Sequence, residues 1–413
     1  PSTISLRLIN WLIALDVFGE AIAADKSFMG KMYQSMYLQY KHLDNNQEKH
    51  LLGNHYFENL KTLLICSLLF DEKDVFQRIE KSFMRQLNEQ ILEDGVHYER
   101  SMMYHKLILE GLLRVSLAYK SVKRKTPEII ISKLQVMINA ATSIEKGMGK
   151  TPFFNDAADG IAKETKQLAD ACMEVLDIAA DDSLTSFKNS GFYKLYDQNV
   201  AIVCFAGDPG PRYMLGHSHC DVLSYEMSVD NQPLIVNSGT FAYQSDLRSY
   251  FRSTEAHNTA MIFNEEQMEY WGEHRVARGA KNVVAKQNNN PHLSAKYVTY
   301  GGKTHKRIIA LNNETLKIQD NFQGKHLKIL SFIHLAPGVK AVLNNNEVLA
   351  QCGDLCFTVK SSSKMNIKPY IYSPEFGILD NSPSIIEVSS KAEQISYFLK
   401  IVKHCEGSEI TND

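Results

Sequence analysis

The sequence lacks a marked excess of charge of either sign. Its 45 Lys and Arg residues against 47 Asp and Glu residues give a formal net charge of −2, which argues against a protein that binds nucleic acid or an anionic membrane surface through bulk charge. No apolar run reaches the ~18 residues that a membrane span requires. We therefore expect a globular protein with no membrane span and no nucleic-acid partner.

Cysteine is also scarce. The chain has 7 Cys in 413 residues, an odd number scattered along its length, which excludes a small scaffold held together by disulfides. The opening stretch PSTISLRLINWLIALDVFGEA carries Arg7 and Asn10 among its apolar residues and shows no small-residue cleavage site. We interpret it as an amphipathic helix rather than a signal peptide. Because no initiator Met is present, we expect the natural N-terminus to lie upstream.

Proline and glycine are sparse in the first part of the chain, where 3 of 11 Pro and 8 of 22 Gly occur up to about residue 185. Apolar residues recur there at three-and-four spacing, which predicts amphipathic helices in an array or toroid of helical hairpins. The predicted helices span residues 5–23, 27–43, 52–70, 74–92, 103–122, 127–147 and 164–178.

After residue 190 the pattern changes to short alternating or apolar runs, separated by Asp-Asn, Gly-Gly and Asn-Asn turn signals. Such runs predict strands. Few helical periods lie between them, so the strands should pair as antiparallel hairpins in a sandwich, because parallel sheets need crossover helices. We predict an all-helical domain at residues 1–185 and an antiparallel β-sandwich domain at 186–413.

The stretch LGHSHCDVLSYEMS (215–228) is the densest group of chemically capable residues. His217 and His219 stand two apart at the entrance to a predicted strand, so both imidazoles would point to the same face. Such a pair can bind a metal, or one ring can bind metal while the other meets substrate. Two ordinary histidines at a strand end are the alternative. His257 follows in a polar loop before another apolar run.

Two further polar clusters lie at predicted helix starts. Asn54 and Glu58 are four residues apart in LLGNHYFENLKTLL, with His55 beside them, so Asn54 and Glu58 share one helical face. Arg100 and Tyr104 lie in a loop and the following helical turn of DGVHYERSMMYHKLILEGLL. Helix starts favour polar residues, so capping and packing are the alternative explanation.

Taken in this order and at these separations, the stretches resemble the heparinase II/III-like polysaccharide lyases, in which an α/α toroid precedes an antiparallel β-sandwich. The resemblance spans nearly the whole chain and implies an incomplete toroid here. Its most specific parts are Gly53-Asn54-His55 with Glu58 and Asn59, Tyr98-Glu99-Arg100-Ser101 with Tyr104-His105, His217-Ser218-His219 with Asp221, Gly239-Thr240, and Ala256-His257-Asn258-Thr259.

The resemblance implies a carbon-oxygen lyase that cleaves a uronic-acid-containing acidic polysaccharide or oligosaccharide, such as a glycosaminoglycan, by β-elimination. Asn54 matches the family's carboxylate-binding residue, and its NH2 group donates hydrogen bonds without titrating. Tyr104 matches the catalytic tyrosine, whose phenolate Arg100 would stabilise. His55 and His217 match positions of a histidine base or a charge-stabilising imidazole, and the sequence leaves open which of them removes the proton.

The resemblance also implies a structural zinc ion. His219 and His257 match two of its ligands, and Asn237 stands at the third position, where the family more often has Asp. An amide oxygen is a poorer zinc ligand because it brings no negative charge, so Asp221 is an alternative third ligand.

Substrate binding should require cations for carboxylates and aromatic faces for sugar rings. The candidates are Glu58, Arg100, Tyr243, Arg248 and Trp271. The alternative interpretation is that Arg248 forms surface ion pairs and that Trp271 is a half-buried structural residue.

Two other functions stay open. A glycan-binding or polysaccharide-assembly protein could keep the fold without activity, and Asn237 with Phe241, where tyrosine is frequent, favours that view. A glycoside hydrolase would need two carboxylates across a cleft, for which Glu58 and Glu99 are available. The resemblance suggests a bacterial protein of the periplasm, or one associated with making surface polysaccharide.

Overall fold

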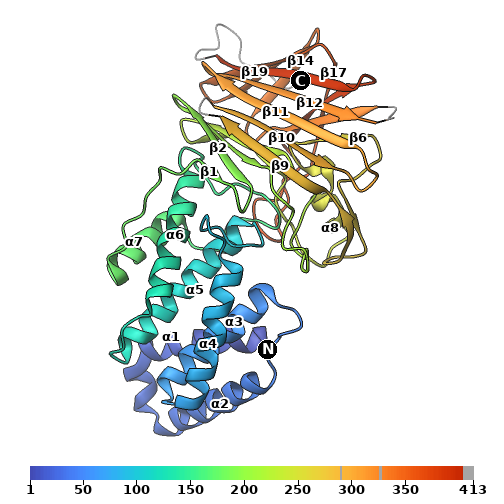
Figure 1. Cartoon of the computed structure of the whole chain (residues 1–413). Coiled ribbons are helices and arrows are strands. Elements are labelled where there is room, and N and C mark those ends of the chain that lie inside the picture. Colours follow the sequence, from blue (N-terminus) through green and yellow to red (C-terminus); the bar gives the residue numbers. More distant parts are fainter. Residues whose placement is uncertain (289–290, 325–327, 403–413) are drawn as a thin grey trace. The chain divides into compact units, whose positions relative to one another are not determined.

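The computed structural model describes residues 1–288, 291–324 and 328–402, in which helices precede strands as predicted (Figure 1). The first strand begins at Ser186, where the sequence pattern also changes. The chain divides into two compact units, each made of several segments. The first unit comprises Pro1–Leu92, Leu107–Ile138 and Lys166–Ala180, and the second comprises Glu93–Lys106, Asn139–Thr165 and Asp181–Asp413.

All seven predicted helices are present, with every end within three residues of its predicted position. They are α1 (Ser2–Ala24), α2 (Lys26–Asn45), α3 (Gly53–Leu69), α4 (Lys73–Gln90), α5 (Met102–Ser121), α6 (Glu128–Glu145) and α7 (Thr165–Leu176). The first turn of α5 and the last two turns of α6 belong to the second unit. The unit boundaries therefore fall within helices, and the division into domains at residue 185 stays a prediction.

The core of the first unit follows from helical periodicity. In α4, Phe76, Ile79, Phe83 and Leu87 recur every three or four residues and are buried, so they form one apolar stripe. Helix α3 is buried along nearly its whole length, because it packs against α1, α2 and α4. None of the helices in the described residues combines the length and apolar composition that crossing a bilayer requires.

The second unit contains four sheets, whose strands pair antiparallel throughout the described residues, as predicted. The five-stranded sheet has the order β1 (Ser186–Phe187), β2 (Phe192–Asp197), β3 (Val200–Phe205), β4 (Ser224–Val229) and β5 (Gln232–Ile235). The eight-stranded sheet has the order β14 (Lys340–Asn344), β15 (Glu347–Cys352), β16 (Leu355–Ser361), β19 (Gln394–Val402), β12 (Thr315–Gln323), β11 (Thr304–Asn312), β10 (His292–Val298) and β9 (Lys281–Asn288).

The other two sheets are smaller. The four-stranded sheet has the order β17 (Lys364–Pro369), β18 (Ser384–Ser390), β13 (Ile329–His334) and β6 (Ala260–Ile262), and a hairpin joins β7 (Met268–Tyr270) to β8 (Val276–Gly279). Before β6 the chain forms the short helix α8 (Arg248–Arg252) and a 3-10 turn at Thr254–Ala256. The sequence pattern had placed His257 in a polar loop and had predicted no helix at Arg248–Arg252.

Turn chemistry sets the hairpin register. Asp230-Asn231 joins β4 to β5 and Asn345-Asn346 joins β14 to β15, and all four residues have φ between 45° and 67°. Two successive positive φ values give the type I′ turn, whose twist matches that of antiparallel strands and which Asn and Asp tolerate. The predicted turn signals are confirmed at these two sites.

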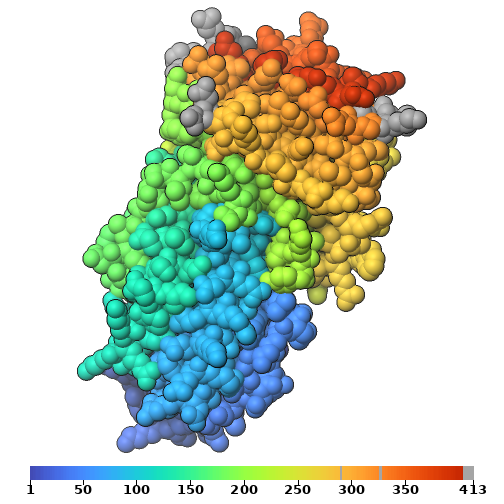
Figure 2. Space-filling view, viewed as in Figure 1, coloured from blue at the N-terminus to red at the C-terminus, as the bar shows by residue number. Residues whose placement is uncertain are grey.

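The pattern of buried residues along the strands differs between the sheets. Residues of β11 and β12 alternate between buried and more exposed positions, which is typical of a sheet with one face on the core. Their outer face is part of the amber and orange surface in Figure 2. In contrast, β3, β4 and β13 are buried at every position, so these strands are covered on both faces.

A buried ion pair crosses from β11 to β12. Arg307 and Asp320 are register partners, and Nε and Nη2 of Arg307 donate to the two carboxylate oxygens of Asp320 at 2.7 and 2.8 Å. His305 Nε2 lies 2.8 Å from Asp320 Oδ1. Bidentate geometry with charge-assisted hydrogen bonds offsets the cost of burying these charges.

Candidate functional site

Tyr104 lies in the first turn of α5, and Ser101 sets the start of that helix. The Tyr104 N–H donates to Ser101 Oγ at 3.3 Å, and the His105 N–H donates to the Ser101 carbonyl oxygen at 2.9 Å. This is the capping arrangement that satisfies unpaired N–H groups at a helix start. It orients Tyr104, whose hydroxyl lies 2.6 Å from the hydroxyl of Tyr243.

The Tyr104 and Tyr243 rings both lie against the imidazole of His217. The ring centroids are 4.3 Å apart for Tyr104 and His217 and 5.8 Å apart for Tyr243 and His217. Thus the structure brings together Tyr104 and His217, which are 113 residues apart in the sequence. Tyr243, a predicted substrate-binding residue, joins them.

The buried carboxylate of Asp156 holds this cluster together. His217 Nδ1 lies 2.8 Å from Asp156 Oδ2, and His219 Nε2 lies 2.8 Å from Asp156 Oδ1. Arg248 binds the same carboxylate in a bidentate manner, with Nη2 2.8 Å from Oδ2 and Nη1 bonded to Oδ1. Asp156 therefore fixes the orientations of two imidazoles and one guanidinium.

Sequence reasoning did not identify Asp156. The residue stands in the stretch Phe153-Phe154-Asn155-Asp156-Ala157, and a carboxylate among apolar neighbours was the only local signal. Charged residues are almost never fully buried unless they are paired. That rule favours a structural or functional partner for Asp156 but does not name it.

The surroundings shift the proton affinities of the cluster. Burial raises the pKa of Asp156, but the positive charge of Arg248 and the hydrogen bonds from His217 and His219 outweigh it and hold that pKa well below its usual value. Burial lowers the pKa of His217, whereas the hydrogen bond to Asp156 and the charge of Glu99 raise it above its usual value on balance.

The phenols stay protonated at neutral pH. Burial, followed by the negative charge of Asp156, raises the pKa of Tyr104 far above its usual value. The same two causes, in the same order, raise the pKa of Tyr243. Arg248 is the cation that lowers the pKa of Tyr104 in part, a role that the sequence had suggested for Arg100.

Asn155 ties three segments of the site together from a left-handed backbone conformation, with φ 55°. Its side-chain oxygen accepts from the His219 N–H at 3.0 Å, and its Nδ2 donates to the Arg100 carbonyl oxygen at 3.0 Å. Its own N–H donates to Asp221 Oδ2 at 2.6 Å. Asn155 therefore fixes the backbone on both sides of the cluster.

Gly239 is required by close packing next to the site. Its φ is 81°, and a Cβ atom there would lie 2.1 Å from the carbonyl oxygen of Ser373. A side chain would therefore displace the backbone that leads to Thr240, whose hydroxyl accepts from the Ala157 N–H at 3.2 Å.

The predicted metal ligands His219 and His257 are neighbours. His219 Nδ1 lies 3.2 Å from His257 Nε2, and both rings are buried. Burial lowers the pKa of both imidazoles, so both rings are neutral at neutral pH. Two neutral nitrogens at this separation could serve as ligands of one ion, and an anionic third ligand would then be needed.

Asn237 does not supply that ligand. Its side-chain oxygen already accepts from the Ser224 hydroxyl at 2.8 Å and the Asn258 N–H at 3.0 Å, which occupies its two lone pairs. Its buried Nδ2 has no hydrogen-bond partner, but an amide NH2 group cannot bind a cation. The donor set at Asn237 therefore does not fit zinc.

The alternative ligand Asp221 does not complete the set either. Burial raises its pKa to about 7, so only about half of these carboxyl groups are ionised at neutral pH. Within the described residues, no three His, Cys, Asp or Glu side chains are arranged to hold a metal ion. The zinc ion stays a prediction from the resemblance, and the geometry weighs against it.

The predicted substrate-binding arginines are engaged within the protein. Arg100 donates to the carbonyl oxygens of Asp208 at 2.7 Å and Asn189 at 3.4 Å. Arg248 is 4% exposed and is bound to Asp156. Trp271 differs, since its side chain is 74% exposed at the turn between β7 and β8. Substrate binding by these residues stays a prediction.

Asn54, His55 and Glu58 lie on the first two turns of α3, in the first unit. His55 Nδ1 is 3.5 Å from Glu48 Oε1, and Glu58 accepts a hydrogen bond from Lys61. Each of the three side chains is half-buried. Their participation in one site with Tyr104 and His217 stays a prediction.

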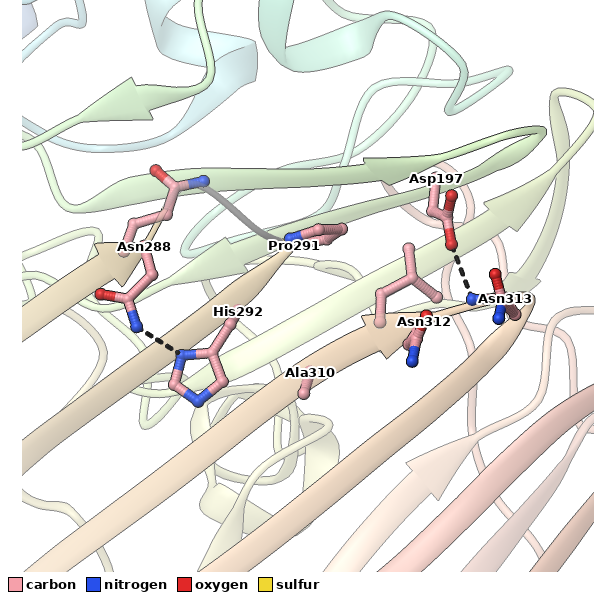
Figure 3. Close-up of a pocket in the computed structure, with 9 residues that line it drawn as sticks. Asp197, Asn288, Pro291, His292, Ala310, Asn312 and Asn313 are labelled. Atoms are coloured by element: carbon pink, nitrogen blue, oxygen red, sulfur yellow. Dashed lines mark hydrogen bonds between the residues drawn. The ribbon is translucent and has the colours of Figure 1, made fainter.

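A separate hollow of about 850 Å³ lies at the hairpin ends of the second unit (Figure 3). Asn288 donates to His292 there at 3.4 Å, and the Asn313 N–H donates to Asp197 at 2.8 Å. None of the residues that line it belongs to the Tyr104 cluster. The hollow therefore does not extend the site described above.

Two family models match the chain and together establish the family to which it belongs. The model described as Heparinase II/III N-terminus matches residues 2–184, and the model described as Heparinase II/III-like, C-terminal, matches residues 179–401. The chain belongs to the heparinase II/III-like family. The resemblance inferred from the sequence motifs is thereby confirmed. No curated protein matches the chain in a sequence search.

Solved structures share this fold of the heparinase II/III-like family. The Heparinase III-BT4657 gene product matches with a TM-score of 0.77 and 18% identity over 97% of this chain and 67% of its own. Heparan sulfate lyase HepC from Pedobacter heparinus matches with a TM-score of 0.71 and 19% identity over 98% of this chain and 68% of its own.

Chondroitinase AC lyase is a more distant match, with a TM-score of 0.53 and 9% identity over 91% of this chain and 64% of its own. At these identities the likeness establishes the fold, a helical toroid followed by antiparallel sheets.

Proposed function

We propose that the chain is a polysaccharide lyase that cleaves a uronic-acid-containing glycan by β-elimination. The observation that carries the proposal is the cluster of Tyr104, Tyr243 and His217, in which two hydroxyls 2.6 Å apart lie against an imidazole held by Asp156. These groups can exchange protons with a sugar. Family membership and the lyase names among the similar structures support the choice of reaction.

The reaction removes the proton on C5 of the uronate and expels the sugar attached through O4. The electrons of the C5–H bond form the C4=C5 double bond, the C4–O4 bond breaks, and the leaving oxygen takes up a proton. The C5 proton is only weakly acidic, so the adjacent carboxylate must accept the developing charge. Hydrogen-bond donors placed at such a charge contribute roughly 3–4 kcal/mol each.

In this proposal Asn54 donates to the uronate carboxylate. An amide suits the role because its NH2 group stays neutral and donates at any pH. The position of Asn54 at the N-terminus of α3 adds a favourable dipole for an anion, since unpaired N–H groups point outward from a helix start.

Tyr104 would protonate the leaving oxygen. Its raised pKa keeps the phenol in the protonated form that an acid requires, and the hydroxyl of Tyr243 at 2.6 Å can return a proton to it. Each positioned proton transfer is worth ~10²–10⁴-fold in rate. The Tyr104 and Tyr243 phenols can therefore supply the general acid, and the reaction needs no buried carboxylic acid for that step.

His217 would remove the C5 proton or stabilise the charge that its removal creates. Its Nδ1 is committed to Asp156, so Nε2 is the nitrogen through which it would act on substrate. A carboxylate behind an imidazole fixes the tautomer and stabilises the imidazolium. His55 remains the second candidate for this role, as the resemblance implies.

An absorbance assay over a panel of uronate glycans tests the proposal. The unsaturated product absorbs in the ultraviolet, and we expect turnover on at least one acidic glycan. Tyr104→Phe should lower kcat by ~10²-fold or more. Tyr196→Phe is the matched control, because Tyr196 is an exposed phenol on β2 outside the cluster. Turnover that survives Tyr104→Phe would contradict the assignment of Tyr104.

The same assay separates the alternatives. Cleavage without a double bond would indicate a glycoside hydrolase, and binding without cleavage would indicate an inactive glycan-binding or polysaccharide-assembly protein. Substrates of this class are extracellular or cell-surface polymers. We therefore also propose that the protein acts in the periplasm or in the context of bacterial surface polysaccharide.

A further inference from the structure

Two buried arginines hold the turn Trp271–Arg275 between β7 and β8. Arg252 Nη1 donates to the carbonyl oxygens of Gly272 at 3.1 Å and Glu273 at 2.8 Å. Arg248 Nε donates to the same Glu273 carbonyl at 3.2 Å. Both arginines are nearly inaccessible, with 1% and 4% exposure. Charge-assisted hydrogen bonds from buried donors fix the backbone of this turn.

The same arginines attach the turn to the cluster. Arg248 binds the Asp156 carboxylate, which also holds His217. Arg252 Nε donates at 3.1 Å to the carbonyl oxygen of Ser218, the residue after His217. The position of the turn is therefore set by the groups that orient the catalytic imidazole.

His274 is the side chain of this turn that lies against the cluster. Its ring centroid is 6.1 Å from that of His217 and 5.2 Å from that of Tyr243, and both contacts are edge-on. His274 is exposed, whereas His217 and Tyr243 are largely covered. A ligand that approaches Tyr243 and His217 from solvent would therefore meet His274.

The charge state of His274 suits binding to a polar sugar. Burial lowers its pKa, and the positive charges of Arg248 and His217 lower it further, while a hydrogen bond with the backbone of Gly216 acts in the opposite sense. The neutral ring offers one donor and one acceptor. The ring nitrogen that does not bind Gly216 can therefore accept a hydrogen bond from a sugar hydroxyl.

We propose that His274 is a specificity-determining residue that hydrogen-bonds to an oxygen of the uronate glycan next to Tyr243 and His217. The inference rests on the proposed function for the class of substrate. It adds a contact from His274, a residue that neither the motifs nor the family match assigns. Trp271, three residues earlier and widely exposed, presents an apolar face on the same turn, so one short segment would offer both a hydrogen bond and a stacking surface.

Measuring KM and kcat of His274 variants tests this inference. The substrate is the glycan that turns over best. We expect His274→Ala to raise KM about tenfold, the loss expected for one hydrogen bond, with little change in kcat. His274→Gln, which keeps an amide donor and acceptor, should recover part of that loss. Both variants should melt within a few degrees of the unmodified protein, because His274 is exposed.

His292→Ala is the matched control. His292 lies on β10, bonded to Asn288 and outside the Tyr104 cluster, and its replacement should leave KM unchanged. If His274→Ala also leaves KM unchanged while the protein makes unsaturated product, the role of His274 is overturned and the lyase proposal stands.

Calorimetric binding of a uronate oligosaccharide distinguishes the remaining outcomes. If the unmodified protein makes no unsaturated product but binds the oligosaccharide, and His274→Ala weakens that binding, then the lyase proposal fails and the contact by His274 is supported. If the protein neither cleaves nor binds any glycan of the panel, both proposals are overturned.

Discussion

Replacing Asp156 by Asn tests the role of the buried carboxylate. The substitution keeps the size of the side chain and one oxygen but removes the negative charge. In the native protein that charge is bound by Arg248, His217 and His219. The Asn variant would leave a buried guanidinium without its counter-ion and would leave one oxygen where His217 and His219 now use two.

The size of the effect follows from these contacts. Removing one partner of a buried ion pair costs about 3–5 kcal/mol. At roughly 2–4 °C per kcal/mol for a domain of this size, we expect the melting temperature to fall by on the order of 10 °C. A misplaced imidazole would lose most of the ~10²–10⁴-fold that a positioned proton transfer supplies, so kcat should fall by about that factor.

Asp320→Asn provides a matched control. Asp320 is also fully buried, bound in a bidentate manner by Arg307 and bonded to His305, but it lies on β12, outside the Tyr104 cluster. The two Asn variants should lose similar stability. Only Asp156→Asn should lose turnover when both are assayed at a temperature where each remains folded.

The assay is calorimetric melting combined with steady-state kinetics on the best glycan. If Asp156→Asn loses no more turnover than Asp320→Asn, then Asp156 serves the fold alone and does not position His217. If Asp156→Asn neither lowers the melting temperature nor slows turnover, the ion pair with Arg248 neither stabilises the fold nor positions His217.

Two other predictions concern residues that the resemblance identified. Asn54→Ala should lower kcat by ~10²-fold or more, with Asn45→Ala, an exposed position at the end of α2, as control; near-normal rates on the best glycan would remove Asn54 from the mechanism. The protein equilibrated with zinc and then dialysed should retain substoichiometric zinc by elemental analysis, whereas Asn237→Asp should retain more, since a carboxylate adds a charged oxygen ligand. Stoichiometric zinc in the unmodified protein would show that Asn237 does not prevent binding.

Local sequence patterns predicted most of the fold. The three-and-four spacing of apolar residues in α4 and the paired Asn and Asp turns of the hairpins predicted the observed elements, because both signals depend on neighbours in the sequence. The short helix α8 was missed, since five residues are too few to show a period. The composition of the two compact units could not be predicted, because it depends on which helix ends pack with the sheets.

The site was predicted in part. The motifs named Tyr104 and His217 for the same reaction, and the structure places their ring centroids 4.3 Å apart, while their catalytic roles stay predictions. Asp156 and His274 were not identified, because their roles arise from contacts between segments far apart in the sequence. The joining of Asn54 to the same site stays a prediction, since it lies in the other compact unit.

The most direct test of the account is the chemical structure of the product from the unmodified protein. Mass spectrometry and NMR of a digested uronate oligosaccharide should show a new non-reducing end with a C4=C5 double bond, and a total product mass equal to that of the substrate. Products that together carry one added water and no double bond would show hydrolysis, and would contradict β-elimination at the cluster of Tyr104, Tyr243 and His217.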